Sequence, residues 1–208
     1  MTSHLNDLQE IRKMMEKSSR FLSLSGLSGV SAGVVALVAA ALAYFKREEL
    51  MGSLVGKGFT YAGKVVPAYV DFLIKLAVIT LILAIVSGIF FTWRKAKKSI
   101  SSLWNPVSKK LVLNMAIPLL SGGAVILALL ANHVYFLIPE LTLIFYGLAL
   151  ISASQYTYRD VFYLGLCELI LGVLGLGING YSLLLWTMGF GLLHILYGII
   201  MHLKYDRK

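Results

Sequence analysis

Long apolar blocks alternate with short polar segments along most of this chain. Each of six blocks runs for about 20 residues and contains few charged side chains. A helix that rises 1.5 Å per residue crosses the ~30 Å hydrocarbon core of a bilayer in about 20 residues. The pattern therefore predicts an all-α integral membrane bundle of six transmembrane helices. The predicted spans cover about 22–45, 72–93, 111–131, 137–156, 161–178 and 181–203.

The first 20 residues are polar and follow a different pattern. Apolar residues recur among charged ones at helical spacing over 5–20, which predicts a cytoplasmic amphipathic helix. Such a helix lies on the membrane surface or docks on a partner. The polar start also argues against a cleaved signal peptide. We therefore divide the chain into an amphipathic segment, 1–20, and a six-span transmembrane domain, 21–208.

Composition supports lipid as the solvent for much of the chain. Hydrophobic residues make up 58% of the sequence and charged residues only 14%, and the mean hydropathy is +0.80. A soluble domain carries about a quarter charged residues. The net charge of +9 does not indicate nucleic-acid binding, because the Lys and Arg residues lie between the apolar blocks. The single cysteine, Cys167, excludes an internal disulfide.

The distribution of positive charge predicts the orientation of the spans. With six spans, 14 of the 19 Lys and Arg residues fall on the side that holds both termini, and four fall on the other side. Positive charge concentrates on the cytoplasmic side of membrane proteins, so both termini are predicted to be cytoplasmic. The loop 94–110 carries six positive charges and no acid, which predicts contact with anionic lipid at the inner surface.

Three connections between spans have recognisable features. Asn105-Pro106 is typical of a helix start, with Asn as the N-cap and Pro at the first helical position. Asn179-Gly180 predicts a tight turn between the last two spans. The segment 46–71 is interrupted by glycines and is predicted as the one long outer loop.

The last two spans carry matching stripes of small and polar residues. Within each stripe the residues recur every three or four positions and share one helix face, where small side chains let two helices approach closely. The stripes are Gly165, Glu168, Gly172 and Gly175 in the fifth span and Thr187, Gly191, His194 and Gly198 in the sixth. A Gly29-x-x-x-Gly33 pattern predicts close packing of the first span as well.

Glu168 and His194 are the strongest candidate site residues, because ionisable side chains are costly inside a bilayer and mark functional sites there. A hairpin of the last two spans places Glu168 opposite Gly191, with His194 one turn lower and both side chains about 12 Å deep. One interpretation is a hydrogen bond that locks the hairpin. The others are proton or ion movement through Glu168 and a contribution to a substrate pocket. One His and one Glu fall short of a metal site, and no cofactor is expected.

A second candidate region lies in the third span. Pro118 removes a helical hydrogen bond and frees a carbonyl near Asn114, so this region is either a packing kink or part of a substrate path. Asn114 and Thr187 join the two ionisable residues as predicted pore or substrate lining. At the outer end of the fourth span, Pro139-Glu140 fits a first helical turn, with the acid at the positive end of the helix dipole. A carboxylate of an outer vestibule has the same appearance in the sequence.

The motif Gly-Leu-Ser-Gly around Ser28 resembles the serine motif of rhomboid intramembrane proteases. The resemblance implies Ser28 as a nucleophile and His194 as its partner in the sixth span. The serine of rhomboids belongs to their fourth span, however, and the spacing from His194 to Gly198 differs from theirs.

A longer resemblance covers the N-terminal segment and the start of the first span. The stretch EIRKMMEKSSRFLSLSGLSG, which begins at Glu10, resembles an uncharacterised group of small bacterial polytopic inner-membrane proteins. The resemblance implies a multi-pass protein of the bacterial inner (cytoplasmic) membrane and implies no activity.

Three classes of function remain. The leading class is a small transporter-like or channel-like protein for a solute, ion or lipid. The alternative is a non-transporting membrane scaffold, sensor or assembly partner that uses the basic inner face. An intramembrane enzyme comes third, because motifs such as His-Glu-x-x-His are absent from the sequence, and no catalytic residue is assigned. A homo-oligomer or a membrane-protein partner stays open, and no nucleic-acid partner is expected.

Overall fold

The structure is a computed structural model that describes residues 25–54, 58–98, 105–178 and 180–206. Every regular element among these residues is a helix, and six helical stretches are long and apolar enough to cross a membrane. The predicted all-α bundle of six transmembrane helices is therefore confirmed. The expected amphipathic helix over 5–20 lies outside the described residues.

Five spans are formed by single helices, and the sixth is divided. The first five are α2 (Gly26–Leu54), α3 (Gly58–Lys98), α4 (Pro106–Ala131), α5 (Ile138–Ala153), which continues into the 3₁₀ turn η1 (Ser154–Tyr156), and α6 (Asp160–Gly177). The sixth consists of α7 (Ser182–Trp186), the π-helix η2 (Thr187–Leu193), α8 (His194–Met201) and a second π-helix, η3 (His202–Asp206). A π-helix is wound more widely than an α-helix and often marks a functional site.

The first two spans are longer than their hydropathy predicts. α2 continues to Leu54 and α3 begins at Gly58, so most of the segment 46–71 is helical rather than a loop. The glycines suggested a loop, but a glycine inside a helix costs only about 1 kcal/mol relative to alanine. Gly52, for example, lies within α2.

The starts of α4 and α5 follow the signals in the sequence. Asn105 caps α4, and its side chain accepts a hydrogen bond from the backbone N–H of Ser108 at 2.8 Å. The backbone N–H of Asn105 donates in return to the Ser108 hydroxyl at 2.9 Å, which completes a capping box. Pro106 occupies the first helical position as predicted. Pro139 and Glu140 lie in the first turn of α5, also as predicted.

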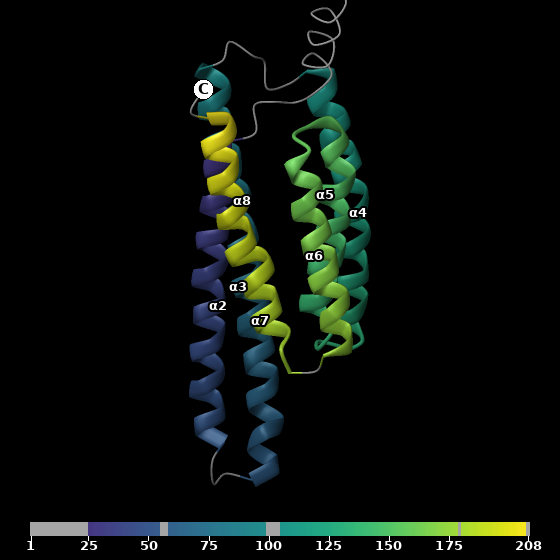
Figure 1. The fold of residues 1–208 in the computed structure, drawn as a ribbon. Coiled ribbons are helices and arrows are strands. Elements are labelled where there is room, and N and C mark those ends of the chain that lie inside the picture. Colours follow the sequence, from purple (N-terminus) through teal and green to yellow (C-terminus); the bar gives the residue numbers. More distant parts are fainter. Residues whose placement is uncertain (1–24, 55–57, 99–104, 179, 207–208) are drawn as a thin grey trace, which may run out of the picture.

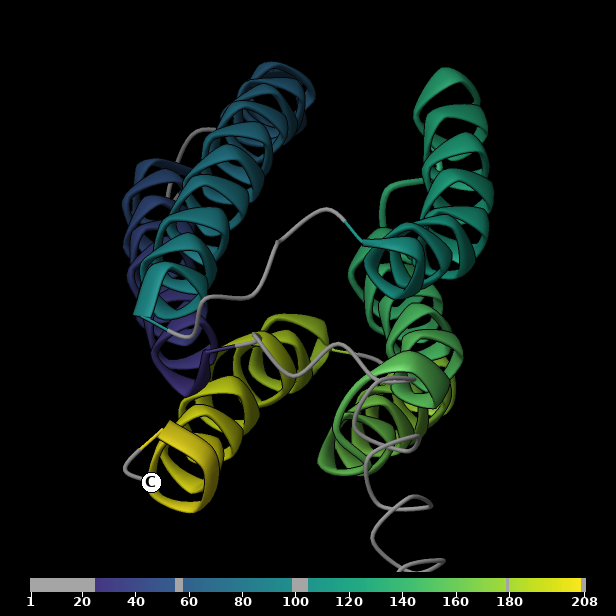
Figure 2. The same ribbon diagram turned by 90° about the horizontal axis from the view of Figure 1, so that it is seen from above.

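The helices form a curved row (Figure 2). Neighbours along the row are α3, α2, the divided sixth span, α6, α5 and α4. In Figure 1 the row is seen from the side, with α2, α3 and α8 in one group and α4, α5 and α6 in the other. We call α2, α3 and the sixth span the first group, and α4, α5 and α6 the second group. The helices at the ends of the row, α3 and α4, have almost wholly exposed apolar stretches.

Each glycine stripe faces a helix of its own group. A side-chain carbon at Gly165 would lie 2.8 Å from the carbonyl oxygen of Gly147 in α5. One at Gly198 would lie 2.7 Å from the carbonyl oxygen of Gly26 in α2. Only glycine permits such close helix contacts. The prediction that the two stripes face each other across a tight hairpin is wrong for their glycines, because those of α6 pack on α5 and those of the sixth span pack on α2. Glu168 and His194 of the same stripes do meet.

The remaining packing glycines follow the same division. A side-chain carbon at any of them would meet atoms of a neighbouring helix of the same group, and one at Gly175 would also meet Leu185 of α7 in the other group. The neighbours are Ile144 and Glu140 for Gly172, Glu140 for Gly175, Leu37 for Gly191, Gly198 for Gly29 and Ile195 for Gly33.

The two groups meet where α6 and α5 lie against the sixth span, and we call this contact the joint. We call the end of the bundle that holds Gly26 and Asp206 the inner end and the opposite end the outer end, whichever side of the membrane each faces. A buried apolar cluster fills the inner half of this joint and contains residues of α5, α6 and α8. Met201 of α8 and Leu150 of α5 belong to it. At the outer end, Gly180 connects the groups with a φ of 90°, the left-handed conformation that a glycine turn accommodates. Asn179, its predicted partner in this turn, lies outside the described residues.

Candidate functional site

Glu168 and His194 lie together at the joint, halfway across the membrane spans. Glu168 is eight residues from the start of α6 at Asp160, which corresponds to about 12 Å of helix rise. His194 lies near the middle of the sixth span, Ser182–Asp206. Both side chains are buried, with exposures of 0% for Glu168 and 5% for His194. The structure thus brings together the two ionisable residues that the sequence singled out.

The imidazole of His194 contacts both groups of helices. Its Nδ1 lies 3.1 Å from the carbonyl oxygen of Gly189, with hydrogen-bond geometry, and 3.2 Å from Oε1 of Glu168. A carbonyl oxygen only accepts, so Nδ1 carries a proton in this arrangement. Nε2 lies 3.0 Å from the hydroxyl of Tyr146 in α5, and a ring that carries its proton on Nδ1 alone accepts the hydroxyl proton there. Glu168, His194 and Tyr146 therefore form one polar cluster across the joint.

Apolar and aromatic side chains enclose this polar cluster. The ring of Phe190 stacks on His194, with centroids 5.8 Å apart and an interplanar angle of 22°. Phe190 also contacts Tyr146, with centroids 5.1 Å apart. Leu143 is wholly buried beside the cluster. Surroundings of low polarity strengthen the electrostatic interactions of the enclosed groups.

The Glu168 carboxylate lacks hydrogen-bond partners. Neither of its oxygens has one among the described residues, although Oε1 is at ion-pair distance from His194. The Nδ1 proton of His194 is directed toward Gly189 instead. Buried polar atoms are normally hydrogen-bonded, so the two oxygens of Glu168 are an exception that calls for an explanation.

Gly189 makes room for this carboxylate. A side-chain carbon at Gly189 would lie 2.5 Å from Oε2 of Glu168 and 2.5 Å from Leu143. The sequence predicted Gly191 in this place, but Gly191 faces α2. The prediction assumed the 3.6 residues per turn of an α-helix. The π-helix η2 has more residues per turn, so its side chains point in other directions than the prediction assumed.

The other two predicted lining residues make hydrogen bonds within their own helices. The hydroxyl of Thr187 donates to the carbonyl oxygen of Leu183 at 2.6 Å. The side-chain amide of Asn114 donates to the carbonyl oxygen of Lys110 at 2.8 Å. A role for Thr187 and Asn114 in lining a path stays a prediction.

Ser28, the serine of the rhomboid-like motif, has a local contact. Its hydroxyl donates to the backbone carbonyl of Ser25, one turn earlier. The imidazole of His194 is directed toward Tyr146, Gly189 and Glu168. The structure therefore does not pair Ser28 with His194 as a nucleophile and its base.

A second buried carboxylate, Glu140, was not among the predicted site residues. It is only 2% exposed and lies in the first turn of α5, at the outer end of the joint. Its side chain lies against Gly175 of α6, and its Oε2 has no hydrogen-bond partner among the described residues. The glycine stripe of α6 could have indicated the burial of Glu140, because some residue of a neighbouring helix must fill the space beside Gly175.

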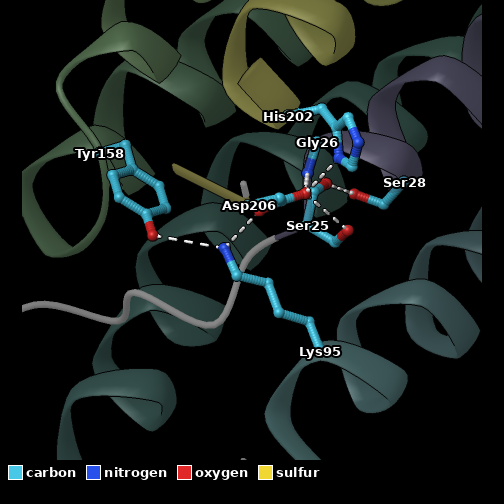
Figure 3. A network of polar contacts seen from close by, with 7 residues as sticks. All are labelled: Ser25, Gly26, Ser28, Lys95, Tyr158, His202 and Asp206. Atoms are coloured by element: carbon cyan, nitrogen blue, oxygen red, sulfur yellow. Dashed lines mark hydrogen bonds and ion pairs between the residues drawn. The ribbon is translucent and has the colours of Figure 1, made fainter. Parts of the chain in front are cut away.

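A polar network at the inner end of the bundle was also missed (Figure 3). Asp206 at the end of η3 is its centre. The carboxylate pairs with the ammonium of Lys95 in α3 at 2.7 Å and accepts a hydrogen bond from the backbone N–H of Gly26 at 3.0 Å. The hydroxyl of Ser25 and the Nδ1 of His202 also contact this carboxylate, at 3.3 and 3.1 Å. The network holds the inner ends of α2, α3 and the sixth span together.

Further contacts connect this network to the second group of helices. Lys95 donates to the hydroxyl of Tyr158 in the second group at 3.4 Å. Asp160 of α6 accepts hydrogen bonds from Tyr205 at 2.7 Å and from Lys204 at 3.0 Å. The rings of Tyr158 and Tyr205 stack with centroids 4.1 Å apart. No pattern in the sequence indicates these contacts, because the partners are far apart along the chain.

Comparisons with protein-family models, with curated proteins and with solved structures gave no match. Within the part of the chain that the structure describes, no three His, Cys, Asp or Glu side chains are grouped as metal ligands would be. The case for a function therefore depends on the geometry at the joint.

Proposed function

We propose that this protein is a small membrane transporter or channel that moves a solute, an ion or a lipid, with Glu168 as its central binding group. The observation that carries the proposal is the wholly buried Glu168 carboxylate, whose oxygens lack hydrogen-bond partners among the described residues. A side chain that only locks two helices together normally has its polar atoms paired. An ionisable group in the middle of a membrane that is not paired in this way suits the transient binding of a ligand.

The position of the site at the joint supports the same proposal. Glu168 belongs to the second group and His194 to the first, so any movement of one group against the other changes the site. Secondary transporters bind their substrates near the middle of the membrane, between parts that move in this manner. Most of the glycine contacts lie inside one group, and they favour movement of each group as a rigid unit.

We also propose a location and an orientation. The N-terminal resemblance supports the bacterial inner membrane, and the excess of Lys and Arg on one side supports cytoplasmic termini and contact of the segment 94–110 with anionic lipid. The contact between Gly26 and Asp206 agrees with an even number of crossings, because it joins the first and last spans at one end of the bundle.

The alternative function is a membrane scaffold, sensor or assembly partner. The exposed apolar surfaces of α3 and α4, at the two ends of the row, favour it, because they offer area for a second copy or for another membrane protein. This alternative gives no role to the unpaired oxygens of Glu168.

Proteoliposomes test the proposal. Vesicles that contain the wild-type protein are challenged with a panel of salts and small polar solutes while their volume is followed by stopped-flow light scattering, and the flipping of a fluorescent lipid is followed in parallel. We expect the wild-type protein to accelerate at least one of these movements relative to empty vesicles. The variant Glu168→Gln keeps the size of the side chain and loses its charge, so we expect it to give the rate of empty vesicles.

Glu48→Gln is the matched control, because Glu48 is an exposed carboxylate near the outer end of α2. We expect this variant to retain the wild-type rate. Thermal unfolding of each variant in detergent shows whether the fold is retained. If Glu168→Gln moves solutes as fast as the wild type and only melts at a lower temperature, Glu168 is a packing residue and the proposal is wrong.

A further inference from the structure

The geometry points to the proton as the ion that Glu168 binds, with Glu140 on the outer side and Tyr197 on the inner side as further carriers of the same proton path. This inference rests on the proposed function and goes beyond it, because it names the ion and the route. Each of these three side chains has a polar atom that is buried and lacks a hydrogen-bond partner among the described residues. They lie at successive depths along one joint.

The surroundings of Glu168 suit a proton better than a metal cation. A hard cation such as Ca²⁺ needs six or more oxygen ligands, and even Mg²⁺ keeps an octahedral shell of about six. The atoms around the carboxylate include the imidazole of His194, the apolar side chain of Leu143 and the backbone of Gly189. The titratable groups that face it are His194 from α8 and Tyr146 from α5. Each of them can pass a proton along a hydrogen bond.

Glu140 is the carrier on the outer side. Its carboxylate lies against Gly175, and Gly175 is seven residues, or about 10 Å of helix rise, outward from Glu168 on α6. Both carboxylates are more than nine-tenths buried, and each has an oxygen without a hydrogen-bond partner among the described residues. Leu143, one turn from Glu140, is wholly buried and lies with Glu168 beside Gly189.

Tyr197 is the carrier on the inner side. It lies one turn inward from His194 on α8 and packs against the buried cluster of the joint, as does Tyr146. Its hydroxyl has no hydrogen-bond partner among the described residues. Asp160 and Tyr205 at the inner end are close enough to interact electrostatically with Tyr197. The route thus reaches the polar network at the inner surface.

The transfer at the centre of the route conserves protons and moves no electrons. His194 takes a proton from the Tyr146 hydroxyl on Nε2 and gives its Nδ1 proton to Oε1 of Glu168, 3.2 Å away. Tyr146 takes up a proton from the inner side in the same step, so that no buried tyrosinate forms, and Tyr197 packs against the same buried cluster on that side. The same steps in reverse order carry a proton inward.

Proton flux into proteoliposomes tests the inference. The vesicles contain the pH-sensitive dye pyranine, and a potassium gradient with valinomycin drives proton movement. We expect wild-type vesicles to change internal pH faster than empty ones, and Glu168→Gln and Glu140→Gln each to lower this rate by about tenfold or more. Tyr197→Phe removes only a hydroxyl, and we expect it to slow the flux by a smaller factor.

Matched controls separate the route from general effects of substitution. Glu48→Gln removes an exposed carboxylate, and Tyr163→Phe removes a hydroxyl from an exposed position on α6. Both are expected to conduct protons at the wild-type rate. Flux through Glu140→Gln at the wild-type rate would overturn the outer half of the route, and the same result for Tyr197→Phe would overturn the inner half.

Two further measurements keep the inference independent of how the variants fold. Infrared difference spectra of the wild-type protein in the same vesicles are expected to show a carboxyl C=O band that changes with pH, and the absence of such a band would overturn the inference. Volume changes that depend on Glu168 without any proton flux would also overturn it, while the proposed transport function would stand. The absence of any flux that depends on Glu168 would remove both.

Discussion

A missing side chain at Gly189 decides where the Glu168 carboxylate lies. The carboxylate occupies the space beside Gly189, in contact with Leu143 and at 3.2 Å from the imidazole of His194. Each of these neighbours is itself buried. Since the interior of a bundle is close-packed, even one added methyl group must displace something.

Gly189→Ala tests this arrangement. The methyl group would lie 2.5 Å from Oε2 of Glu168, so we expect the carboxylate to move and transport to fall strongly, with a loss of about 1–3 kcal/mol in the free energy of unfolding. Gly123→Ala is the control, because a methyl group there meets nothing within 4 Å. It is expected to keep transport and to stabilise α4 by up to about 1 kcal/mol. Light scattering and thermal unfolding measure both effects, and wild-type transport by Gly189→Ala would contradict the arrangement.

Helix pairs held by glycine contacts are the rigid units at the next scale. α6 packs on α5 through Gly165 and Gly147, and α8 packs on α2 through Gly198, Gly26 and Gly29. At these points the backbones themselves are in contact. Helices inside a membrane have little hydrophobic reason to associate, so such close packing supplies much of their attraction.

Gly198→Ala is expected to separate α8 from α2. Its methyl group would lie 2.5 Å from the backbone nitrogen of Val30, and a backbone cannot turn aside as a side chain can. We expect a loss of about 1–3 kcal/mol in the free energy of unfolding, measured by thermal melting in detergent. Gly88→Ala in α3 is the matched control, with open space around the new methyl group, and is expected to melt no lower than the wild type. Equal melting temperatures for the two variants would show that the contact adds nothing.

The existence of the helices was predictable from sequence, and their partners were not. Hydropathy and the cap at Asn105 depend on neighbouring residues, so the six spans and the start of α4 were correctly predicted. The glycine stripes showed that close contacts exist but carried no information on which helix fills each one. The position of Gly189 beside Glu168 depends on the π-helical winding of η2, which no pattern in the sequence indicates. The contact between Glu168 and His194 was nevertheless predicted correctly, because both side chains are long enough to meet although Gly189, and not Gly191, lies opposite Glu168.

At the scale of the whole molecule, the inner ends of the two helix groups are tied together. Asp206 fixes Lys95 at 2.7 Å, and Lys95 in turn reaches the Tyr158 hydroxyl of the second group. Asp160 of the second group accepts hydrogen bonds from Lys204 and Tyr205 of the first group. The arrangement closes the inner end of the joint, which a transporter must open during its cycle.

Asp206→Asn is expected to weaken this closure. The amide keeps a hydrogen-bond acceptor for Gly26 but loses the ion pair with Lys95. In this ion pair the side chain of Lys95 is 20% exposed and that of Asp206 is 9% exposed. We expect a loss of about 1–3 kcal/mol in the free energy of unfolding. Asp71→Asn breaks an ion pair with Lys75 that is 64–70% exposed, and it is expected to change stability by less than about 1 kcal/mol. Thermal unfolding compares the two, and an equal effect would show that the inner network contributes no more than a surface pair.

The central claim is that Glu168 lies in a site that water reaches during the working cycle and not in a permanently dry helix contact. Glu168→Cys in a Cys167→Ser background tests it directly, by the rate of reaction with a charged thiosulfonate reagent in native membranes. Ile170→Cys in the same background is the control, because Ile170 is at nearly the same depth on α6 but 49% exposed on its lipid-facing side. We predict that the cysteine at position 168 reacts readily while the one at 170 does not. A cysteine at 168 as inert as the one at 170 would contradict the account.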